Sequence, residues 1–161
     1  MFRRQRSDTP QLFLVAAIVV LADQLSKRYI ATHCSPGVEG CRTIIPGWLR
    51  WSYEQNQHGA FGLFGDSPVL LIAMAAVVLA VFWLSFREQA RSSLTVRIAF
   101  GMILGGAIGN IVDRLHYRYV IDFIDFYRWP IWRNTFDVAD TCITVGVALL
   151  ILASLATRRR S

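Results

Sequence analysis

Aspartates that could perform chemistry gather in the last third of the sequence. The stretch "GNIVDRLHYRYVIDFIDFY" contains Asp113, Asp122 and Asp125, and "FDVADTCITVG" adds Asp137 and Asp140. Two aspartates brought within about 4 Å repel by roughly 4 kcal/mol at an effective dielectric of 20, so such a pair holds one proton between its members. One carboxylate can then take a proton from water while the other donates one to a carbonyl group, which is general acid–base hydrolysis.

Four long apolar blocks are the elements that must position these acids. The chain has 161 residues, of which 54% are hydrophobic, and each block has close to the roughly 20 residues that span about 30 Å of hydrocarbon. We therefore predict an all-α membrane protein, with residues 1–161 forming a single integral membrane domain. The four predicted transmembrane helices cover about residues 11–30, 68–86, 94–113 and 137–156.

Basic residues are unevenly divided between the two sides that these helices define. Four spans put both termini on one side, together with the connection between the second and third helices. Nine of the 17 basic residues lie there with two acids, a net charge of +7, whereas the rest of the chain carries −1. By the positive-inside rule both termini are cytoplasmic, and about residues 31–67 and 115–136 are external. Topology and anionic lipid explain these charges, so we expect membrane lipid as a partner and no nucleic acid.

One part of the long external segment has the pattern of a strand. In "IIPGWLRWSYEQN" the residues Leu49, Trp51 and Tyr53 fall on one face, and the polar residues between them fall on the other. We predict a small external β-sheet with an aromatic face at the lipid headgroups, where Trp and Tyr are favoured. This face either only anchors the protein or forms a platform for a lipid-bearing partner.

Two of the three cysteines lie in the same external segment. Cys34 and Cys41 bracket "SPGVEG", whereas Cys142 belongs to the fourth predicted helix. In an oxidising compartment, Cys34 and Cys41 can close a short disulfide that stabilises the loop by about 2 kcal/mol. The cysteines and histidines show no paired ligand spacing, so we expect neither a metal nor a cofactor.

Polar residues interrupt the first and third predicted helices near their outer ends. Asp23 and Lys27 are one helical turn apart and can neutralise each other, as a structural pair or as part of a site. In the third helix, small residues in "GGAIGN" favour close helix packing. Asn110, Asp113 and Arg114 follow on neighbouring helical faces and form either a polar network or an ordinary cap and ion pair.

The remaining acids have partly ordinary explanations. In a strand, Asp122 and Asp125 would point to opposite faces, and in a helix they would share one. Capping of the fourth helix explains one of Asp137 and Asp140 well, but it explains two acids less well. Since all these acids lie at the outer ends of helices or in the loop joining two of them, we predict that they converge on one site.

Five motifs in this chain together resemble a known family. The motifs "DQLSK", "NQHGAFG", "GGAIGNIVDR", "VIDF" and "FDVAD" have the order and spacing found in the lipoprotein signal peptidases (signal peptidase II). These are bacterial inner-membrane aspartyl proteases that remove the signal peptide from diacylglyceryl-modified prolipoproteins, cutting just before the lipidated cysteine. The resemblance implies a multi-pass inner-membrane protein whose site lies near the periplasmic face and whose substrates are lipidated prolipoproteins. We expect it to be a monomer.

The resemblance also assigns roles to single residues. It implies a catalytic dyad of Asp122 and Asp140. We expect amide and guanidinium groups to hold the substrate backbone or polarise its carbonyl, and the first-helix ion pair to brace that helix. We expect Trp51 to cover the bound peptide and Phe61 to touch apolar chain. The six further positions that match the family's motifs are Asp23, Lys27, Asn56, Asn110, Asp113 and Arg114.

Two positions depart from the family pattern. Asn56 is followed by Gln57 and His58, so the glycine that the family has two residues after the asparagine comes one position later. Asp137, which we keep among the supporting residues, stands in place of an amide. If it faces Asp140, it adds a third negative charge and strengthens the dyad's hold on its proton; if it caps the helix, it is nearly harmless.

Without the resemblance, a small proton-coupled transporter or channel is the main alternative. Acids inside membranes often mark ion or proton paths, which require polar access from both sides. The second predicted helix, "SPVLLIAMAAVVLAVFWLSF", contains no ionisable residue, and the cytoplasmic halves of the others are apolar. The sequence therefore favours a protease.

Overall fold

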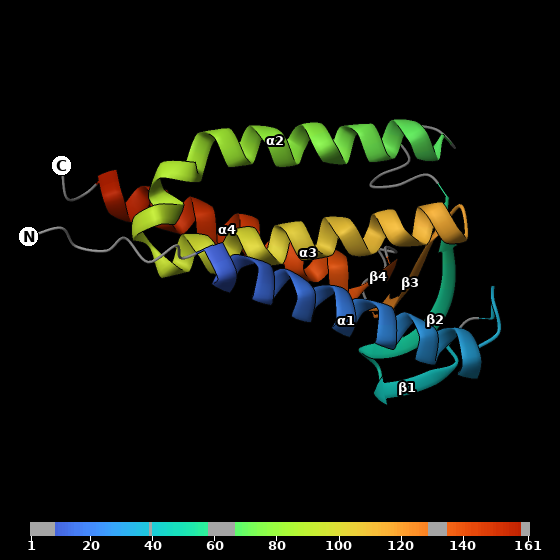
Figure 1. Ribbon diagram of the computed structural model, residues 1–161. Coiled ribbons are helices and arrows are strands. Elements are labelled where there is room, and N and C mark those ends of the chain that lie inside the picture. The colour runs from blue at the N-terminus through green and yellow to red at the C-terminus, as the bar shows by residue number, and fades with distance from the viewer. Residues whose placement is uncertain (1–8, 39, 58–66, 129–134, 159–161) are drawn as a thin grey trace, which may run out of the picture.

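The computed structural model describes residues 9–38, 40–57, 67–128 and 135–158, and within them it contains a bundle of helices with a small sheet at one end (Figure 1). Phe61, His58 and Gly59 lie outside the described residues. The helices are α1 (Thr9–His33), α2 (Pro68–Ser92), α3 (Leu94–His116) and α4 (Val138–Arg158). The strands are β1 (Arg42–Ile45), β2 (Leu49–Asn56), β3 (Val120–Asp125) and β4 (Thr135–Phe136).

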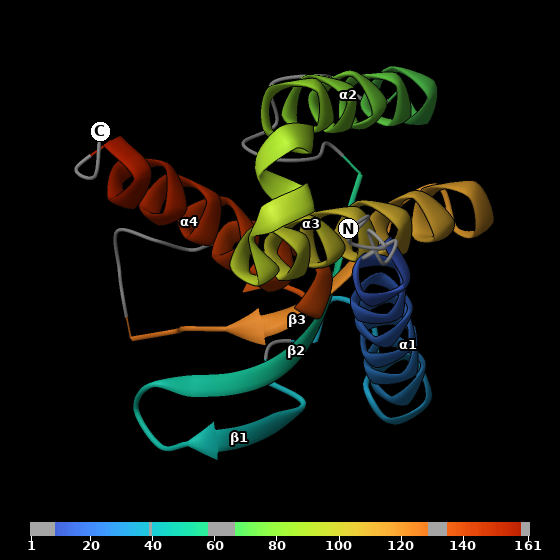
Figure 2. The ribbon, with the colours of Figure 1, turned by 60° about the vertical axis from the view of Figure 1, so that its left-hand side comes forward.

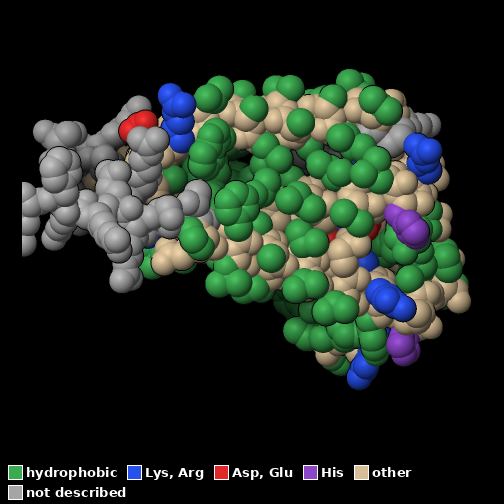
Figure 3. Space-filling view, viewed as in Figure 1, with side chains coloured by type: hydrophobic (Ala, Val, Ile, Leu, Met, Phe, Trp, Pro, Cys, Tyr) green, Lys and Arg blue, Asp and Glu red, His purple; other side chains and the backbone are tan. Residues whose placement is uncertain are grey.

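All four of these helices are long and apolar enough to cross a membrane, which confirms the four predicted helices. Hydrophobic side chains cover most of the helix surface visible in Figure 3. The beginning of α1 and the end of α4 lie at the same end of the bundle, and the sheet lies at the other (Figure 1). The apolar segments that can span are Pro10–His33, Val69–Glu88, Leu94–His116 and Val138–Ala156.

Helix α3 is the centre of the bundle (Figure 2). Half of its spanning segment is buried, compared with 6% of that of α2. Helix α2 contacts the core partly through aromatic residues: Trp83 and Phe86 both pack edge-on against Phe100 of α3. Most of α2 is therefore exposed in the part of the chain that the structure describes.

Glycines let α3 lie directly against two neighbouring helices. A Cβ at Gly105 would lie 2.6 Å from the backbone oxygen of Ala16 in α1, and one at Gly106 would lie 2.5 Å from that of Ala139 in α4. Both distances are far below van der Waals contact, so only glycine permits this packing. The small residues thus permit close helix packing, as predicted. This packing brings the polar ends of α1, α3 and α4 together.

The basic connection between the second and third helices is shorter than expected. Helix α2 continues to Ser92, and α3 begins at Leu94, so Arg87 and Arg91 are helical and only Ser93 separates the two helices. The Ser93 hydroxyl accepts the backbone N–H of Val96 and caps α3.

The sheet has four antiparallel strands in the order β1-β2-β3-β4. The small external sheet was predicted from the β2 segment alone. Its other half comes from residues 115–136, where the sequence predicts only a loop between helices and where the structure has β3 and β4. Pairing of β2 with β3 places Glu54 opposite Asp122 and Arg50 opposite Asp125.

A bulge interrupts the predicted alternation along β2 after Trp51, although Trp51 and Tyr53 contact the same cluster, as their predicted shared face requires. The register shifts between Trp51 and Glu54, so two residues of β2, Ser52 and Tyr53, face one residue of β3 and both are buried. Tyr53 packs in a cluster beneath the sheet with Ile30 and Phe123, and Trp51 packs against this cluster. A bulge cannot be read from side-chain alternation, because it is defined by the pairing with the neighbouring strand.

The sulfur atoms of Cys34 and Cys41 are paired as a disulfide, with a Cα–Cα distance of 5.4 Å. The pair joins the chain just after α1 to the chain just before β1. It therefore links the base of the β1–β2 hairpin to the helix that carries Lys27.

Candidate active site

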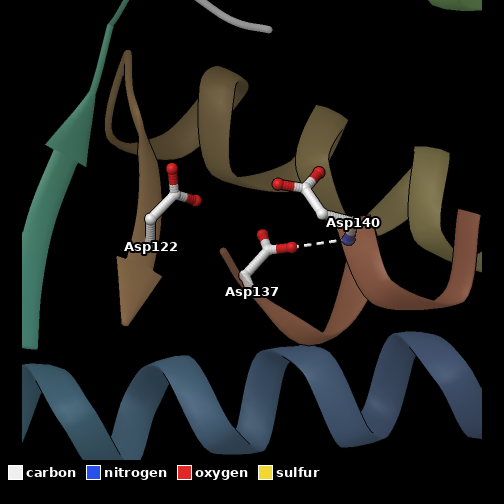
Figure 4. Close-up of side chains that lie close together, drawn as sticks. All are labelled: Asp122, Asp137 and Asp140. Carbon is white, nitrogen blue, oxygen red and sulfur yellow. Dashed lines mark hydrogen bonds between the residues drawn. The ribbon is translucent and has the colours of Figure 1, made fainter. Parts of the chain in front are cut away.

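Three carboxylates meet between the sheet and the first turn of α4. Asp122 comes from β3, Asp137 immediately precedes α4, and Asp140 lies in its first turn. One oxygen of each lies within 4.8 Å of one oxygen of each of the others. Figure 4 shows the three side chains turned toward a common space. The predicted convergence therefore includes Asp122 and Asp140, and Asp137 adds a third acid.

Asp122 is held by the neighbouring strand. The side-chain amide of Asn56 in β2 donates a hydrogen bond of 2.9 Å to its Oδ2. The residue is only 3% exposed, and its Oδ1 has no hydrogen-bond partner among the described residues. Burial, followed by the charges of Asp137 and Asp140, raises the pKa of Asp122 to about 8, while the Asn56 hydrogen bond and Lys27 act in the opposite direction. Asp122 is therefore mostly protonated at neutral pH.

Asp140 is held from α3. The side-chain amide of Asn110 donates to its Oδ1 over 2.9 Å. Asp140 is half-buried, whereas Asp122 is buried. The site is therefore accessible from the side of Asp140. The two predicted dyad members are thus each held by one asparagine amide. We had expected these asparagines to bind substrate; in the structure they bind the carboxylates.

The N-terminus of α4 is capped by two acids. Oδ1 of Asp137 accepts the backbone N–H of Asp140 over 2.6 Å, as drawn in Figure 4, and Oδ1 of Asp23 accepts that of Ala139 over 3.0 Å. Free N–H groups at a helix start favour negative charge. The two alternatives stated for Asp137 are both true, because it caps α4 and also faces Asp140.

Lys27 is the centre of a buried ionic cluster. Its Nζ lies 2.9 Å from Oδ2 of Asp23, 2.9 Å from Oδ2 of Asp113 and 2.6 Å from Oδ2 of Asp137. Lys27 is 2% exposed and the three acids are fully buried. The pair expected within α1 is present, but the same lysine also binds α3 and the residue before α4. Removing Lys27 would leave these three buried carboxylates without their cation.

Asp113 does not form the pair with Arg114 that was one of the alternatives. Besides Lys27, its carboxylate accepts the side-chain amide of Gln24 over 2.9 Å and the backbone N–H of Ile121 over 3.2 Å, which ties α3 to β3. Gln24 was missed in the sequence, although it stands in "DQLSK" as a polar residue inside an apolar span. Arg114 donates to the backbone oxygen of Asn110 over 3.3 Å, and its buried Nε has no partner among the described residues.

The other expected site residues lie further out. Trp51 is half-buried and packs edge-on against Tyr29, with Arg42 over its ring. Its part in a substrate platform stays a prediction. Asp125 forms an ion pair of 2.5 Å with Arg50 on the sheet and is not among the three converging carboxylates. This agrees with two aspartates pointing to opposite faces of a strand.

The arrangement is suited to proton transfer between acids of unequal burial. Three carboxylates this close could in principle attract a cation, but Lys27 already supplies one to Asp137, and we assign no metal to the cluster. Asp122 and Asp140 can share a proton, and water can reach the half-buried one. Such a site can activate water on one side and protonate a carbonyl on the other.

Buried acids at one end of a membrane-capable helix bundle, beneath a small sheet, define a membrane enzyme. The fold matches a bacterial membrane enzyme structure determined by the in meso method at 2.3 Å resolution, with a TM-score of 0.82 and 29% identity over 93% of this chain and 90% of that one. A second bacterial membrane enzyme structure, at 1.9 Å resolution, has a TM-score of 0.78 and 30% identity over 89% and 92% of the two chains.

Sequence comparison then specifies the family. The family described as "Signal peptidase (SPase) II" matches residues 15–156. The lipoprotein signal peptidase of Lactobacillus johnsonii is 39% identical over 86% of this chain and 88% of its own. The lipoprotein signal peptidase of Symbiobacterium thermophilum is 34% identical over 91% of this chain and 95% of its own. The chain belongs to the signal peptidase II family, as the five motifs suggested, and is a multi-pass membrane protease of that family.

Proposed function

We propose that the protein is an aspartic endopeptidase that removes the signal peptide from diacylglyceryl-modified bacterial prolipoproteins, cutting just before the lipidated cysteine. The observation that carries this proposal is the pair of asparagine-held carboxylates, Asp122 and Asp140, from two different elements. Family membership and the four membrane-capable helices supply the substrate class and the setting.

The mechanism follows from the unequal environments of the two carboxylates. Asp122, buried and with its pKa raised to about 8, carries the proton of the pair, and the half-buried Asp140 is the member that water can reach. Asp140 takes a proton from water, whose oxygen adds to the scissile carbonyl carbon, and Asp122 donates its proton to the carbonyl oxygen. When the tetrahedral intermediate collapses, the C–N bond breaks and the proton held by Asp140 passes to the leaving amine. The hydroxyl proton of the intermediate returns to Asp122, which restores the starting state.

The supporting residues act on this pair. Asn56 and Asn110 hold the two carboxylates, and the Lys27 cluster fixes α1, α3 and the start of α4 relative to each other. Arg114, whose Nε has no hydrogen-bond partner among the described residues, is the candidate to contact the substrate backbone. Trp51, together with Phe61, would cover the bound peptide and its apolar chains.

The site belongs, in this proposal, near the periplasmic face of the bacterial inner membrane. The short segments at the other end of the bundle carry the excess of basic residues, so both termini are placed in the cytoplasm. The enzyme acts as a monomer on substrates whose acyl chains stay in the bilayer, without nucleic acid or cofactor.

A proton-coupled transporter or channel is less consistent with the structure. Among the described residues, the buried acids lie at the sheet end of the bundle, and α2 contributes none. A proton path needs polar groups that continue to the opposite side.

The test uses purified protein in detergent and two precursors that differ only in the diacylglyceryl group. Mass spectrometry should find the free signal peptide and a mature chain that begins with the lipidated cysteine, and the unlipidated precursor should remain intact. Failure to cut the lipidated precursor, combined with proton flux in liposomes, would support the transporter instead.

A further inference from the structure

Asp137 uses its two carboxylate oxygens for two different partners. Oδ1 accepts the backbone N–H of Asp140, and Oδ2 lies 2.6 Å from Nζ of Lys27. The side chain is fully buried. One carboxylate therefore connects the helix turn that carries a proposed dyad member to the lysine of α1.

These two contacts need different properties of the side chain. Accepting a backbone N–H at a helix start requires only an acceptor oxygen, which an amide or hydroxyl also supplies. The start of α4 has a second acid as well, because Asp23 accepts the N–H of Ala139. A negative charge at position 137 is therefore not required for the cap.

The charge of Asp137 acts on the two carboxylates of the dyad. Its carboxylate lies within 4.8 Å of those of Asp122 and Asp140. The other charged groups around it are Asp23 and Lys27 from α1 and Asp113 and Arg114 from α3. Lys27 is shared by three acids, so it compensates only one of their charges. The surroundings of the dyad thus remain negative.

We propose that Asp137 is a positioning residue that holds the backbone of Asp140 through the helix cap and, through its charge, keeps the shared proton on the Asp122–Asp140 pair as the pH rises above 7. This inference rests on the proposed proteolytic function. It separates the cap, which any acceptor can provide, from the charge, which only an acid provides.

The direction of the effect can be stated. After burial, Asp137 is the largest of the contributions that raise the pKa of Asp122 to about 8, ahead of Asp140. Removing the charge lowers this pKa, so the dyad loses its proton at lower pH. Activity requires one shared proton and falls at alkaline pH when that proton is lost. This alkaline limb of the pH profile then moves to lower pH.

The experiment compares Asp137→Asn, Asp137→Ala and the wild-type protein, with kcat/KM for the lipidated precursor measured across pH. Asp137→Asn keeps the cap, and its profile should move to lower pH by about one unit while its thermal midpoint stays close to that of wild type. Asp137→Ala should show the same shift together with a lower kcat, because the backbone N–H of Asp140 loses its cap. Asp125→Asn removes a carboxylate outside the cluster and should leave the profile in place.

A second measurement does not depend on the substrate. The infrared band of the protonated carboxyl group that Asp122→Asn abolishes should titrate at lower pH in Asp137→Asn than in wild type. The inference is overturned if the infrared titration midpoint of Asp137→Asn equals that of wild type. It is also overturned if the kcat/KM profile stays in place or moves to higher pH. If wild type leaves the precursor intact, the proposed function fails, whereas the infrared titration still decides the role of the Asp137 charge.

Discussion

Asn56, at the end of β2, donates its side-chain N–H to Oδ2 of Asp122 over 2.9 Å, so a residue of one strand orients the carboxylate of the next. This hydrogen bond favours the ionised form and lowers the pKa of Asp122 against the rise caused by burial. Asn56→Ala should therefore move the pH profile upward, opposite to Asp137→Asn. It should also reduce kcat by roughly two- to tenfold, because a hydrogen bond to an uncharged group contributes about 0.5–1.5 kcal/mol.

Gln57→Ala, an exposed neighbour on the same segment, is the matched control and should behave like wild type. A downward shift for Asn56→Ala, or equal effects of the two substitutions, would show that Asn56 does not act on Asp122.

Lys27→Met should be strongly destabilising, because it leaves Asp23, Asp113 and Asp137 buried without their cation. Breaking a buried pair by removing one partner costs about 3–5 kcal/mol. Arg28→Met changes an exposed residue beside it and should have little effect on the thermal midpoint in detergent.

The loss in Lys27→Met should be greatest above pH 7 and partly relieved near pH 5. The pKa of Asp137 is already raised to about 7, first by burial and then by Asp140, although Lys27 lowers it. Without Lys27 it rises further, so the folded protein binds this proton more tightly than the unfolded chain does. Stability is then lost as pH rises from the ordinary carboxyl range toward the folded pKa. A pH-independent loss would contradict this account of the cluster.

Gly105→Ala should destabilise the bundle by separating α3 from α1. The new Cβ would lie 2.6 Å from the backbone oxygen of Ala16 and 2.7 Å from Cβ of Val19, neither of which can move independently of α1. Overpacking of this kind costs about 1–3 kcal/mol. Ile108→Ala, an exposed site on the same helix, is the control. Equal thermal midpoints for the two variants would argue against the close α1–α3 contact.

The pairing of Cys34 with Cys41 predicts one disulfide and one free thiol. Alkylation without reductant should label only Cys142, and reduction should increase the intact mass by two hydrogen atoms. Cys34→Ser should lower stability by about 2 kcal/mol. Three alkylated cysteines in protein prepared from an oxidising compartment would exclude the bond.

The helices and the acids could be predicted because each leaves a local signal. Apolar blocks of spanning length give the four helices, and glycines in "GGAIGN" give the close packing of α3. Asp23 and Lys27 could be paired because one helical turn separates them. Asp122 and Asp125 in a strand could be assigned to opposite faces.

The partners that come from different elements could not be predicted in the same way. Spacing shows that Lys27 can bind Asp23, but only the packing of three helices brings Asp113 and Asp137 to the same amino group. The bulge after Trp51 depends on the pairing with β3, which sequence alternation does not contain. For the same reason the asparagines were expected on the substrate, whereas Asn56 and Asn110 bind the carboxylates.

The paired-aspartate mechanism is tested most directly by the intact mass of a lipidated precursor after incubation with Asp122→Asn, Asp140→Asn or Asp125→Asn protein. The first two variants should fold normally and leave the precursor at its full mass, with rates reduced by roughly a hundredfold or more. Asp125→Asn removes only the ion pair with Arg50 and should cleave at the wild-type rate. Normal cleavage by either Asp122→Asn or Asp140→Asn would remove that residue from the dyad and contradict the mechanism.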